Sequence, residues 1–307
     1  MADSSWLRRS QKGSETFLDL RRITSEYSNV SDEFQFDQIG YWSEIKLDIL
    51  EKYAKAYSTI LASRRNPSLY HVYIDAFAGA GVHLSRTDQQ VIPGSPLNAL
   101  KVRPPFQEYH LIDIKPKKVE NLRKLIGDRR DVSIYEGDCN QILLEKIFPR
   151  VRYEDYRRAL CILDPYGLDL EWNVISRAGQ MKTIDLFLNF PVADMNRNVL
   201  WRDPERVSGT QAARMSAFWG DESWRDIAYQ TTRNLFGFPE KEPNDVVAEA
   251  FRQRLRRIAG FERVPDPLPM RNSNGAVVYY LFFASQVDTA ERIVFDIFKK
   301  YRPERSP

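Results

Sequence analysis

The chain has 307 residues, of which 43% are hydrophobic and 28% are charged, as in an ordinary water-soluble globular protein. Its net charge of +3 permits binding to nucleic acid without arguing for it. No apolar run approaches the roughly 20 residues of a membrane helix, and the N-terminal residues lack the apolar core of a secretory signal. We therefore expect a cytoplasmic protein without membrane contact. Two cysteines, Cys139 and Cys161, are too few for a disulfide framework or a zinc site, so no metal is expected.

The first two thirds of the chain alternate between helical and strand-like patterns. Residues 1 to about 38 are polar without a period, which indicates a flexible arm. From 41 to 63 apolar residues recur at steps of three and four, which predicts one amphipathic helix. Short apolar runs then follow at 70–74, 109–112, 132–135, 160–163 and 184–190, with helical segments starting near 96, 116, 140 and 171. This alternation predicts a mostly parallel sheet with helices on both faces.

The last third departs from this rhythm. Residues 194–258 look helical throughout, with no convincing strand, and we interpret them as a helical insertion. Aromatic and β-branched residues predict a terminal strand pair at 261–264 and 277–285, joined by a Pro-rich loop and a turn, before a last helix at 289–301. The expected fold class is α/β and Rossmann-like, one domain over 39–307 with a terminal antiparallel strand.

A glycine turn follows the first strand, in the segment "YIDAFAGAG" of residues 73–81. In open α/β sheets ligands bind beyond the carboxyl ends of the strands, and the first strand-to-helix turn usually supplies the cradle. A dinucleotide fingerprint would require a third glycine where this chain has Leu84, which disfavours a nicotinamide oxidoreductase. A tight turn that Asp75 merely caps is the structural alternative.

The spacing Asp75-x-x-x-Gly79-x-Gly81 resembles motif I of the class I S-adenosylmethionine-dependent methyltransferases. An acid suits this cofactor, which carries an ammonium and a sulfonium charge, whereas it would repel a pyrophosphate. The resemblance implies cofactor contacts at Asp75, Phe77, Ala78, Gly79 and Gly81.

Two further acids end the next two strands. Asp113, at the end of "YHLIDI", can accept hydrogen bonds from both hydroxyls of a ribose, as the acid of dinucleotide sites does. Asp138, in "YEGDCN", can accept from an adenine amino group while Cys139 supplies a backbone N–H. The spacing from Asp75 to Asp113 is longer than usual, and we assign the excess to a loop at 82–94. An acid after a strand is common by chance, but three in succession match one cofactor.

The fourth strand leads into Asp164-Pro165-Tyr166-Gly167, here called the D-P-Y-G turn. It resembles the D-P-P-Y motif of methyltransferases that modify exocyclic amines of adenine or cytosine. It resembles more closely the D-P-[FY]-G run of tRNA guanine-N2 dimethyltransferases. The Asp164 carboxylate and the Pro165 carbonyl would draw the amine toward tetrahedral geometry, and Tyr166 would stack on an unstacked base. The alternative is a plain β-turn, for which Asp, Pro and Gly are well suited.

Several longer segments make the chain resemble the bacterial three-Cys-motif partner protein (TcmP) family: "YWSEIKLDIL", "DAFAGAG", "PGSPLNAL", "LDPYG", "FWGDESWR" and "YYLFFAS". The resemblance implies a methyltransferase-like Rossmann protein that binds S-adenosylmethionine and associates with a radical-chemistry protein bearing three cysteines. We expect an N-methyltransferase acting on adenine N6 or guanine N2 in DNA or RNA. The alternative is a cofactor-binding scaffold subunit of that partner with little catalysis of its own.

Weaker candidates lie outside these motifs. Lys46 and Trp42 are candidates for the cofactor cleft, with a surface lysine and a core tryptophan as the alternative. The segment "FRQRLRRIAGF" at 251–261 gathers arginines as phosphate contacts require, or forms a solvated helix face, which is the interpretation we prefer.

Overall fold

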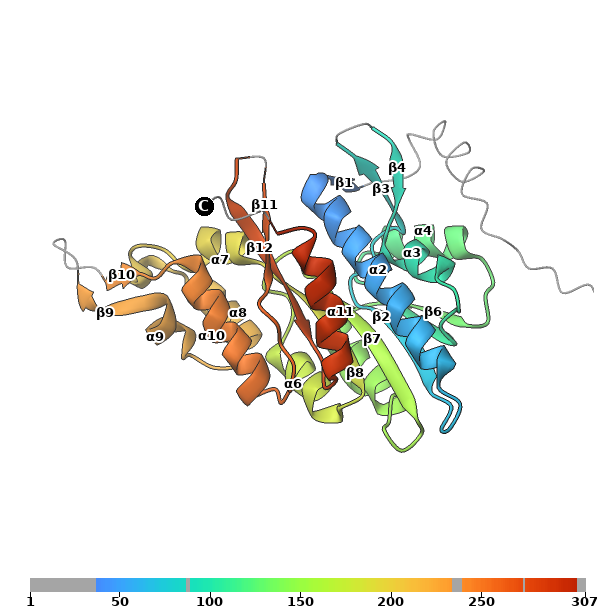
Figure 1. Cartoon of the computed structure of the whole chain (residues 1–307). Coiled ribbons are helices and arrows are strands. Elements are labelled where there is room, and N and C mark those ends of the chain that lie inside the picture. The colour runs from blue at the N-terminus through green and yellow to red at the C-terminus, as the bar shows by residue number, and fades with distance from the viewer. Residues whose placement is uncertain (1–36, 87–88, 234–238, 273, 303–307) are drawn as a thin grey trace, which may run out of the picture. The chain divides into compact units, whose positions relative to one another are not determined.

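A seven-stranded sheet forms the centre of the computed structural model, which describes residues 37–86, 89–233, 239–272 and 274–302 (Figure 1). The strand order is β11–β12–β8–β7–β2–β5–β6. In chain order the strands are β2 (Tyr70–Asp75), β5 (Glu108–Asp113), β6 (Val132–Glu136), β7 (Arg157–Leu163), β8 (Ile184–Phe190), β11 (Leu268–Arg271) and β12 (Val277–Ala284). Strands β6, β5, β2, β7 and β8 pair in parallel, while β12 runs antiparallel to both β8 and β11. The predicted Rossmann-like fold class is confirmed.

Helices cover both faces of this sheet, which is why its central strands β2, β7 and β8 are buried along most of their length. In chain order they are α2 (Tyr41–Ser63), α3 (Ser95–Lys101), α4 (Pro116–Ile126), α5 (Cys139–Ile142), α6 (Trp172–Met181) and α11 (Asp288–Lys299). A π turn (Leu143–Ile147) and a 3-10 turn (Phe148–Arg150) continue α5. No helix of the described residues is both long and apolar enough to cross a membrane.

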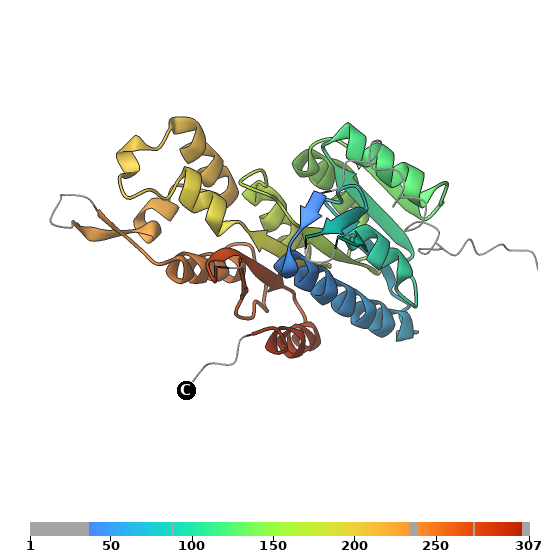
Figure 2. The ribbon, with the colours of Figure 1, turned by 90° about the horizontal axis from the view of Figure 1, so that it is seen from above.

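The alternation of side chains along β8 and β12 places α2 and α10 on opposite faces of the sheet. Phe187 and Phe283 point to the face on which Tyr53 of α2 packs, with ring centroids 5.2 and 4.9 Å away. Phe190 and Phe282 point to the opposite face. There they meet Phe251 of α10 (Asn244–Arg257), 4.7 and 5.6 Å away. Helix α11 lies beside α2 (Figures 1 and 2).

The segment between β8 and β11 is mainly helical, as predicted, but it also contains strands. Its helices are α7 (Val192–Asn198), α8 (Gly209–Trp219), α9 (Trp224–Ala228) and α10, with a 3-10 turn at Pro204–Arg206. Strands β9 (Tyr229–Arg233) and β10 (Pro239–Lys241) pair antiparallel within it. The prediction that residues 194–258 hold no strand was therefore wrong.

Two other segments differ from the predicted pattern. The partner of β12 is β11, within the expected Pro-rich loop, whereas 261–264 makes only an isolated bridge from Arg263 to Ser285. Pro269 is tolerated because β11 is an edge strand and one side of it needs no N–H donor. The expected loop at 82–94 instead holds β3 (Val82–Ser85) and β4 (Val91–Pro93). Together with β1 (Asp37–Ile39) they form a small three-stranded sheet. The end of the arm predicted at residues 1 to about 38 is therefore a strand. Residues 1–36 of that arm lie outside the described residues.

Candidate active site

The glycine turn after β2 has the backbone that its sequence predicts. Gly79 and Gly81 have φ angles of 66° and 86°, in the left-handed region that favours glycine. A Cβ on Gly81 would lie 3.1 Å from Leu125 and 3.2 Å from Leu122, both on α4. Gly81 is thus required for packing of the turn on α4, whereas Gly79 has no such close neighbour.

Asp75 supports this turn from behind. It is 0% exposed and accepts hydrogen bonds from the Phe77 N–H (3.3 Å) and the Tyr73 hydroxyl (3.2 Å). Burial raises the pKa of Asp75 to about 6, although a hydrogen bond from Ser95 opposes the rise. The carboxyl group therefore braces the turn, as the capping alternative anticipated.

The other two acids lie at the ends of the neighbouring strands. Asp113 accepts from the backbone N–H of Gly79 (3.0 Å) and of Lys115 (2.8 Å), and so ties the end of β5 to the glycine turn. Asp138 caps α5 by accepting from the Asn140 N–H at 2.9 Å. Burial, together with the charge of Asp138, raises the pKa of the Cys139 thiol to about 12. Because β2, β5 and β6 are adjacent, the three predicted acids share one edge of the sheet.

A cavity of about 250 Å³ at this edge joins the glycine turn to the D-P-Y-G turn. Five of the predicted site residues line it: Phe77, Ala78, Gly79, Asp164 and Tyr166. Six do not: Asp75, Gly81, Asp113, Asp138, Cys139 and Pro165. The remaining wall comes mainly from β1, α2, β3, α3, β8, α7 and β12, with Lys46, His83, Asn189, Asp194, Arg197 and Tyr279 among its residues.

Asp164 is held by Lys46 from the first helix. Their side chains, 29% and 13% exposed, form an ion pair with 2.5 Å between Nζ and Oδ2. Burial lowers the pKa of Lys46, but the charges of Asp164 and Tyr279 outweigh it, so the pKa of Lys46 is raised overall. Lys46 was only a weak candidate from sequence, yet it faces the site. Trp42 does not line the cavity; its carbonyl accepts from the Tyr279 hydroxyl at 3.4 Å.

The rest of the D-P-Y-G turn is held by contacts that no motif predicted. The Pro165 carbonyl accepts a hydrogen bond from Asn189 Nδ2 at 3.0 Å. Tyr166 is 74% exposed, and its hydroxyl donates to Asp37 of β1 at 3.3 Å. The Lys118 ammonium forms an ion pair with Asp37 and lies 5.5 Å from the centre of the Tyr166 ring. Tyr166 is therefore tethered at its hydroxyl while much of its ring stays accessible.

The cavity wall also holds polar atoms that lack a partner. Among the described residues, His83 Nδ1, Asn189 Oδ1 and Asp194 Oδ2 are buried without a hydrogen-bond partner. Burial, helped by the charge of Lys46, lowers the pKa of His83 to about 4, so this imidazole is neutral at pH 7. Unpaired buried polar groups are costly until a ligand or water satisfies them. The wall is thus suited to a polar ligand.

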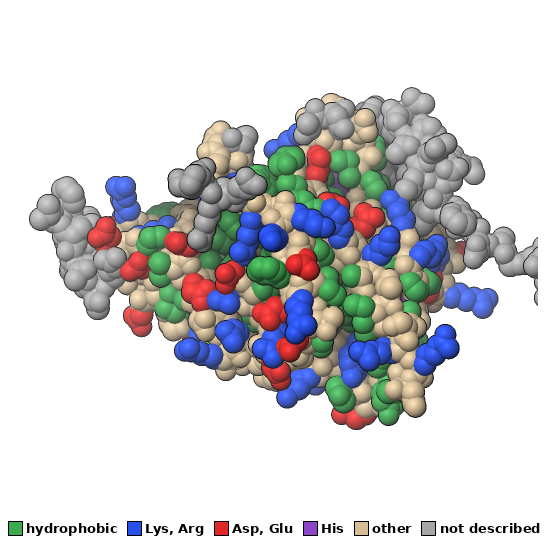
Figure 3. Space-filling model, viewed as in Figure 1, with side chains coloured by type: hydrophobic (Ala, Val, Ile, Leu, Met, Phe, Trp, Pro, Cys, Tyr) green, Lys and Arg blue, Asp and Glu red, His purple; other side chains and the backbone are tan. Residues whose placement is uncertain are grey.

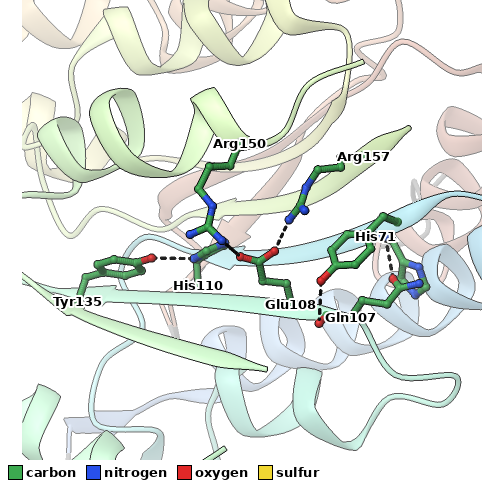
Figure 4. A network of polar contacts seen from close by, with 8 residues as sticks. His71, Gln107, Glu108, His110, Tyr135, Arg150 and Arg157 are labelled. Atoms are coloured by element: carbon green, nitrogen blue, oxygen red, sulfur yellow. Dashed lines mark hydrogen bonds and ion pairs between the residues drawn. The ribbon is translucent and has the colours of Figure 1, made fainter. Parts of the chain in front are cut away.

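A polar network lies around the start of β5, away from the cavity (Figure 4). Glu108, at the start of β5, accepts from Arg150 at 2.8 Å and forms an ion pair with Arg157. His110 lies 2.9 Å from Glu108 and 3.1 Å from the Tyr135 hydroxyl, and burial lowers its pKa to about 4. These contacts join β5, β6 and β7, and we assign them a structural role.

Arg254, in the arginine-rich segment 251–261, is neither available for a phosphate contact nor part of a solvated helix face. This side chain is 8% exposed and lies over the rings of Trp172 and Trp219, at 4.9 and 5.4 Å. Its guanidinium pairs with Asp221 at 2.9 Å. Arg254 is part of the packing between α10, α8 and α6, so the interpretation as a solvated helix face was wrong at this position.

Comparison with known proteins gives similarity in structure only. No family model and no curated protein matches the sequence. The solved structure of protein LPL1258 from Legionella pneumophila, of family DUF519, is 13% identical, with a TM-score of 0.45 over 83% of this chain and 92% of that one. A putative S-adenosylmethionine-dependent methyltransferase from Listeria monocytogenes is 12% identical, with a TM-score of 0.39 over 77% and 99%. The METTL16 methyltransferase domain is 10% identical, with a TM-score of 0.37 over 77% and 67%.

Proposed function

We propose that the protein is an S-adenosylmethionine-dependent methyltransferase that acts on an exocyclic amino group of a nucleic-acid base, adenine N6 or guanine N2. The observation that carries the proposal is the shared cavity, which places the glycine turn after β2 beside the D-P-Y-G turn after β7. A methyl donor on the first turn and an amine on the second would then meet. Bringing both reactants together in one orientation is a large part of what a methyltransferase must supply.

The residues at the sheet edge fit the proposed cofactor. S-adenosylmethionine would supply a methyl group on a positively charged sulfur. Backbone atoms of Phe77 to Gly79 would hold its methionine part, with Asp75 bracing the turn from behind. A carboxylate accepts about four hydrogen bonds, so Asp113 can receive ribose hydroxyls while it keeps the Gly79 N–H. The exposed Asp138 uses Oδ1 for the backbone N–H and the side-chain amide of Asn140, which leaves Oδ2 for the adenine amino group.

The D-P-Y-G turn supplies the acceptors for the amine. Asp164 Oδ2 is occupied by Lys46, which leaves Oδ1 for one amino N–H. Pro165 does not line the cavity, but its carbonyl, which accepts from the lining residue Asn189, keeps one lone pair that would accept the second N–H. Two such acceptors draw the nitrogen lone pair out of the ring, because they favour a tetrahedral nitrogen as the methyl arrives. The accessible ring of Tyr166 would stack on the base.

The test is transfer of labelled methyl from the cofactor to separate DNA and RNA substrates. Asp164→Ala should lower kcat by about 10²–10³ without changing the affinity for the cofactor. Lys46→Met should also lower it, with partial recovery in Lys46→Arg. Asp128→Ala, an exposed position at the end of α4, is the matched control. Full activity of Asp164→Ala would remove the catalytic assignment.

A second candidate function is a cofactor-binding scaffold subunit. It is favoured by the engagement of both proposed acceptors, because Lys46 holds Asp164 and Asn189 holds Pro165. A three-cysteine radical-chemistry protein would be its partner, and a cytoplasmic location remains the expectation for either function. Calorimetry with the cofactor, and methyl transfer with and without that partner, separate the two. Cofactor binding without transfer under either condition would favour the scaffold.

A further inference from the structure

A second cavity, of about 330 Å³, lies between the end of α2 and the start of α11. Away from the cavity the two helices are joined by hydrogen bonds: Tyr301, just beyond α11, contacts Asp48 and Lys52 in the first half of α2. Lys52 also pairs with Asp48 at 2.7 Å. The cavity shares no lining residue with the candidate active site. It is therefore a separate feature of the fold, between the two helices that Figure 1 shows side by side.

The walls of this cavity are mainly apolar. They include Tyr53, Tyr57, Ile60, Leu61, Leu69, Ile184, Val287, Ala290 and Ile293. The one acid of the lining, Asp185, is 9% exposed, and both of its oxygens are engaged, by the Tyr53 hydroxyl at 2.5 Å and the Ser285 hydroxyl at 2.6 Å. A ligand therefore need not carry a positive charge to pair with the Asp185 carboxylate. The volume is at the lower end of small-molecule sites, which span about 300–1,000 Å³.

Three cations also line the cavity, Arg64, Arg158 and Lys182, beside the uncharged residues Asn66, Pro67, Thr183, Gln286 and Thr289. Within the described part of the chain no salt bridge pairs any of them with a carboxylate. Arg158 lies 4.2 Å from the centre of the Tyr153 ring and gives one N–H to the Arg157 carbonyl, which leaves further N–H donors. Elsewhere on the surface over α2 and α11, basic side chains lie among acidic ones (Figure 3).

We propose that this cavity binds a small amphipathic carboxylate. Its apolar body would lie between α2 and α11, and its carboxylate among Arg64, Arg158 and Lys182. The charges select the ligand, since the walls alone would accept any apolar molecule and the cations favour an anionic head group. Arginine suits this role because its planar fork matches a carboxylate. The proposal does not depend on the methyltransferase function.

The test uses three probes with the same ten-carbon chain: decanoate, decanol and decyltrimethylammonium. Binding to the full chain is measured by calorimetry and by the shift of the thermal unfolding midpoint. We expect decanoate to bind with a dissociation constant below about 1 mM and to raise the midpoint, and the cationic probe to bind at least about tenfold more weakly. Absence of decanoate binding, or equal binding of the cationic probe, would overturn the proposal.

Variants locate the site. Arg158→Met keeps an apolar stem and should weaken decanoate binding by about three- to fivefold, as loss of one partly exposed charge partner would. Ile293→Trp should abolish binding by filling the cavity, and Ala290→Leu serves if the tryptophan lowers the unfolding midpoint of the free protein. Arg257→Met, an exposed arginine outside the lining, should bind decanoate unchanged. Wild-type affinity in Arg158→Met or in both filling variants would place the ligand elsewhere and refute the site.

Discussion

Replacing Asp75 by asparagine tests whether this acid supports the glycine turn or binds the cofactor. An asparagine keeps an oxygen for the Phe77 N–H and polar atoms beside the Tyr73 and Ser95 hydroxyls, so it can retain a hydrogen bond to each of these three neighbours. What changes is the charge. The wild-type carboxyl group ionises at neutral pH in a completely buried place, whereas the amide stays neutral at every pH.

The size of the effect follows from the raised pKa. The ordinary pKa of an aspartate is 3.8, and burial raises that of Asp75 to about 6. Each pH unit of this difference corresponds to about 1.4 kcal/mol, so ionisation of Asp75 costs the folded state up to about 3 kcal/mol. The pKa of Asp75 is higher in the folded than in the unfolded protein. The contribution of the protonated carboxyl group to stability is therefore fully present below pH 3.8 and is lost as the pH rises through about 6.

We therefore expect Asp75→Asn to unfold at higher urea concentration than the wild type at pH 7, and the gap to close as the pH falls to about 4. Asp185→Asn is a matched control, since burial also raises the pKa of Asp185 to about 6 but this residue lies outside the candidate site. A gap that does not change with pH would refute the electrostatic reasoning. Asp75→Asn should keep its affinity for S-adenosylmethionine within about threefold, and a larger loss would show that the carboxylate contacts the cofactor itself.

Three further predictions concern individual contacts, two at the candidate site and one in the packing of α10. Gly81→Ala should lower the free energy of unfolding by about 1–3 kcal/mol, because a Cβ there meets α4 and the φ angle is positive; an unchanged denaturation curve would contradict this. Arg254→Ala should cost about 2–3 kcal/mol because it removes a buried guanidinium that packs on two tryptophan rings and pairs with the half-exposed Asp221, whereas the exposed Arg257→Ala should stay within about 0.5 kcal/mol in the same unfolding experiment. Asp37→Asn should raise KM for the nucleic-acid substrate, because it loosens Tyr166, with an unchanged cofactor affinity measured by calorimetry as its control.

The alternation of strands and helices along the chain, and the end of the sheet that carries the candidate site, were predicted from sequence. Short apolar runs separated by amphipathic segments specify parallel strands joined by helices. Since all parallel strands end at the same edge, Asp75, Asp113, Asp138 and Asp164 were expected along one edge of the sheet wherever the helices lay. Glycines at 79 and 81 similarly indicated a turn, because other residues rarely adopt a positive φ angle.

Tertiary structure alone decided what closes the site. Lys46, Asn189 and Asp37 contact the D-P-Y-G turn from α2, β8 and β1. Because they lie far from the turn in the sequence, no motif with a fixed spacing links them to it. The edge strand at 268–271 replaced the one expected at 261–264 because pairing with β12 depends on register across the sheet, which local propensity does not encode. Arg254 lies between two tryptophans for the same reason: helical periodicity places a residue on a face of its helix, but packing against other elements determines whether that face meets water.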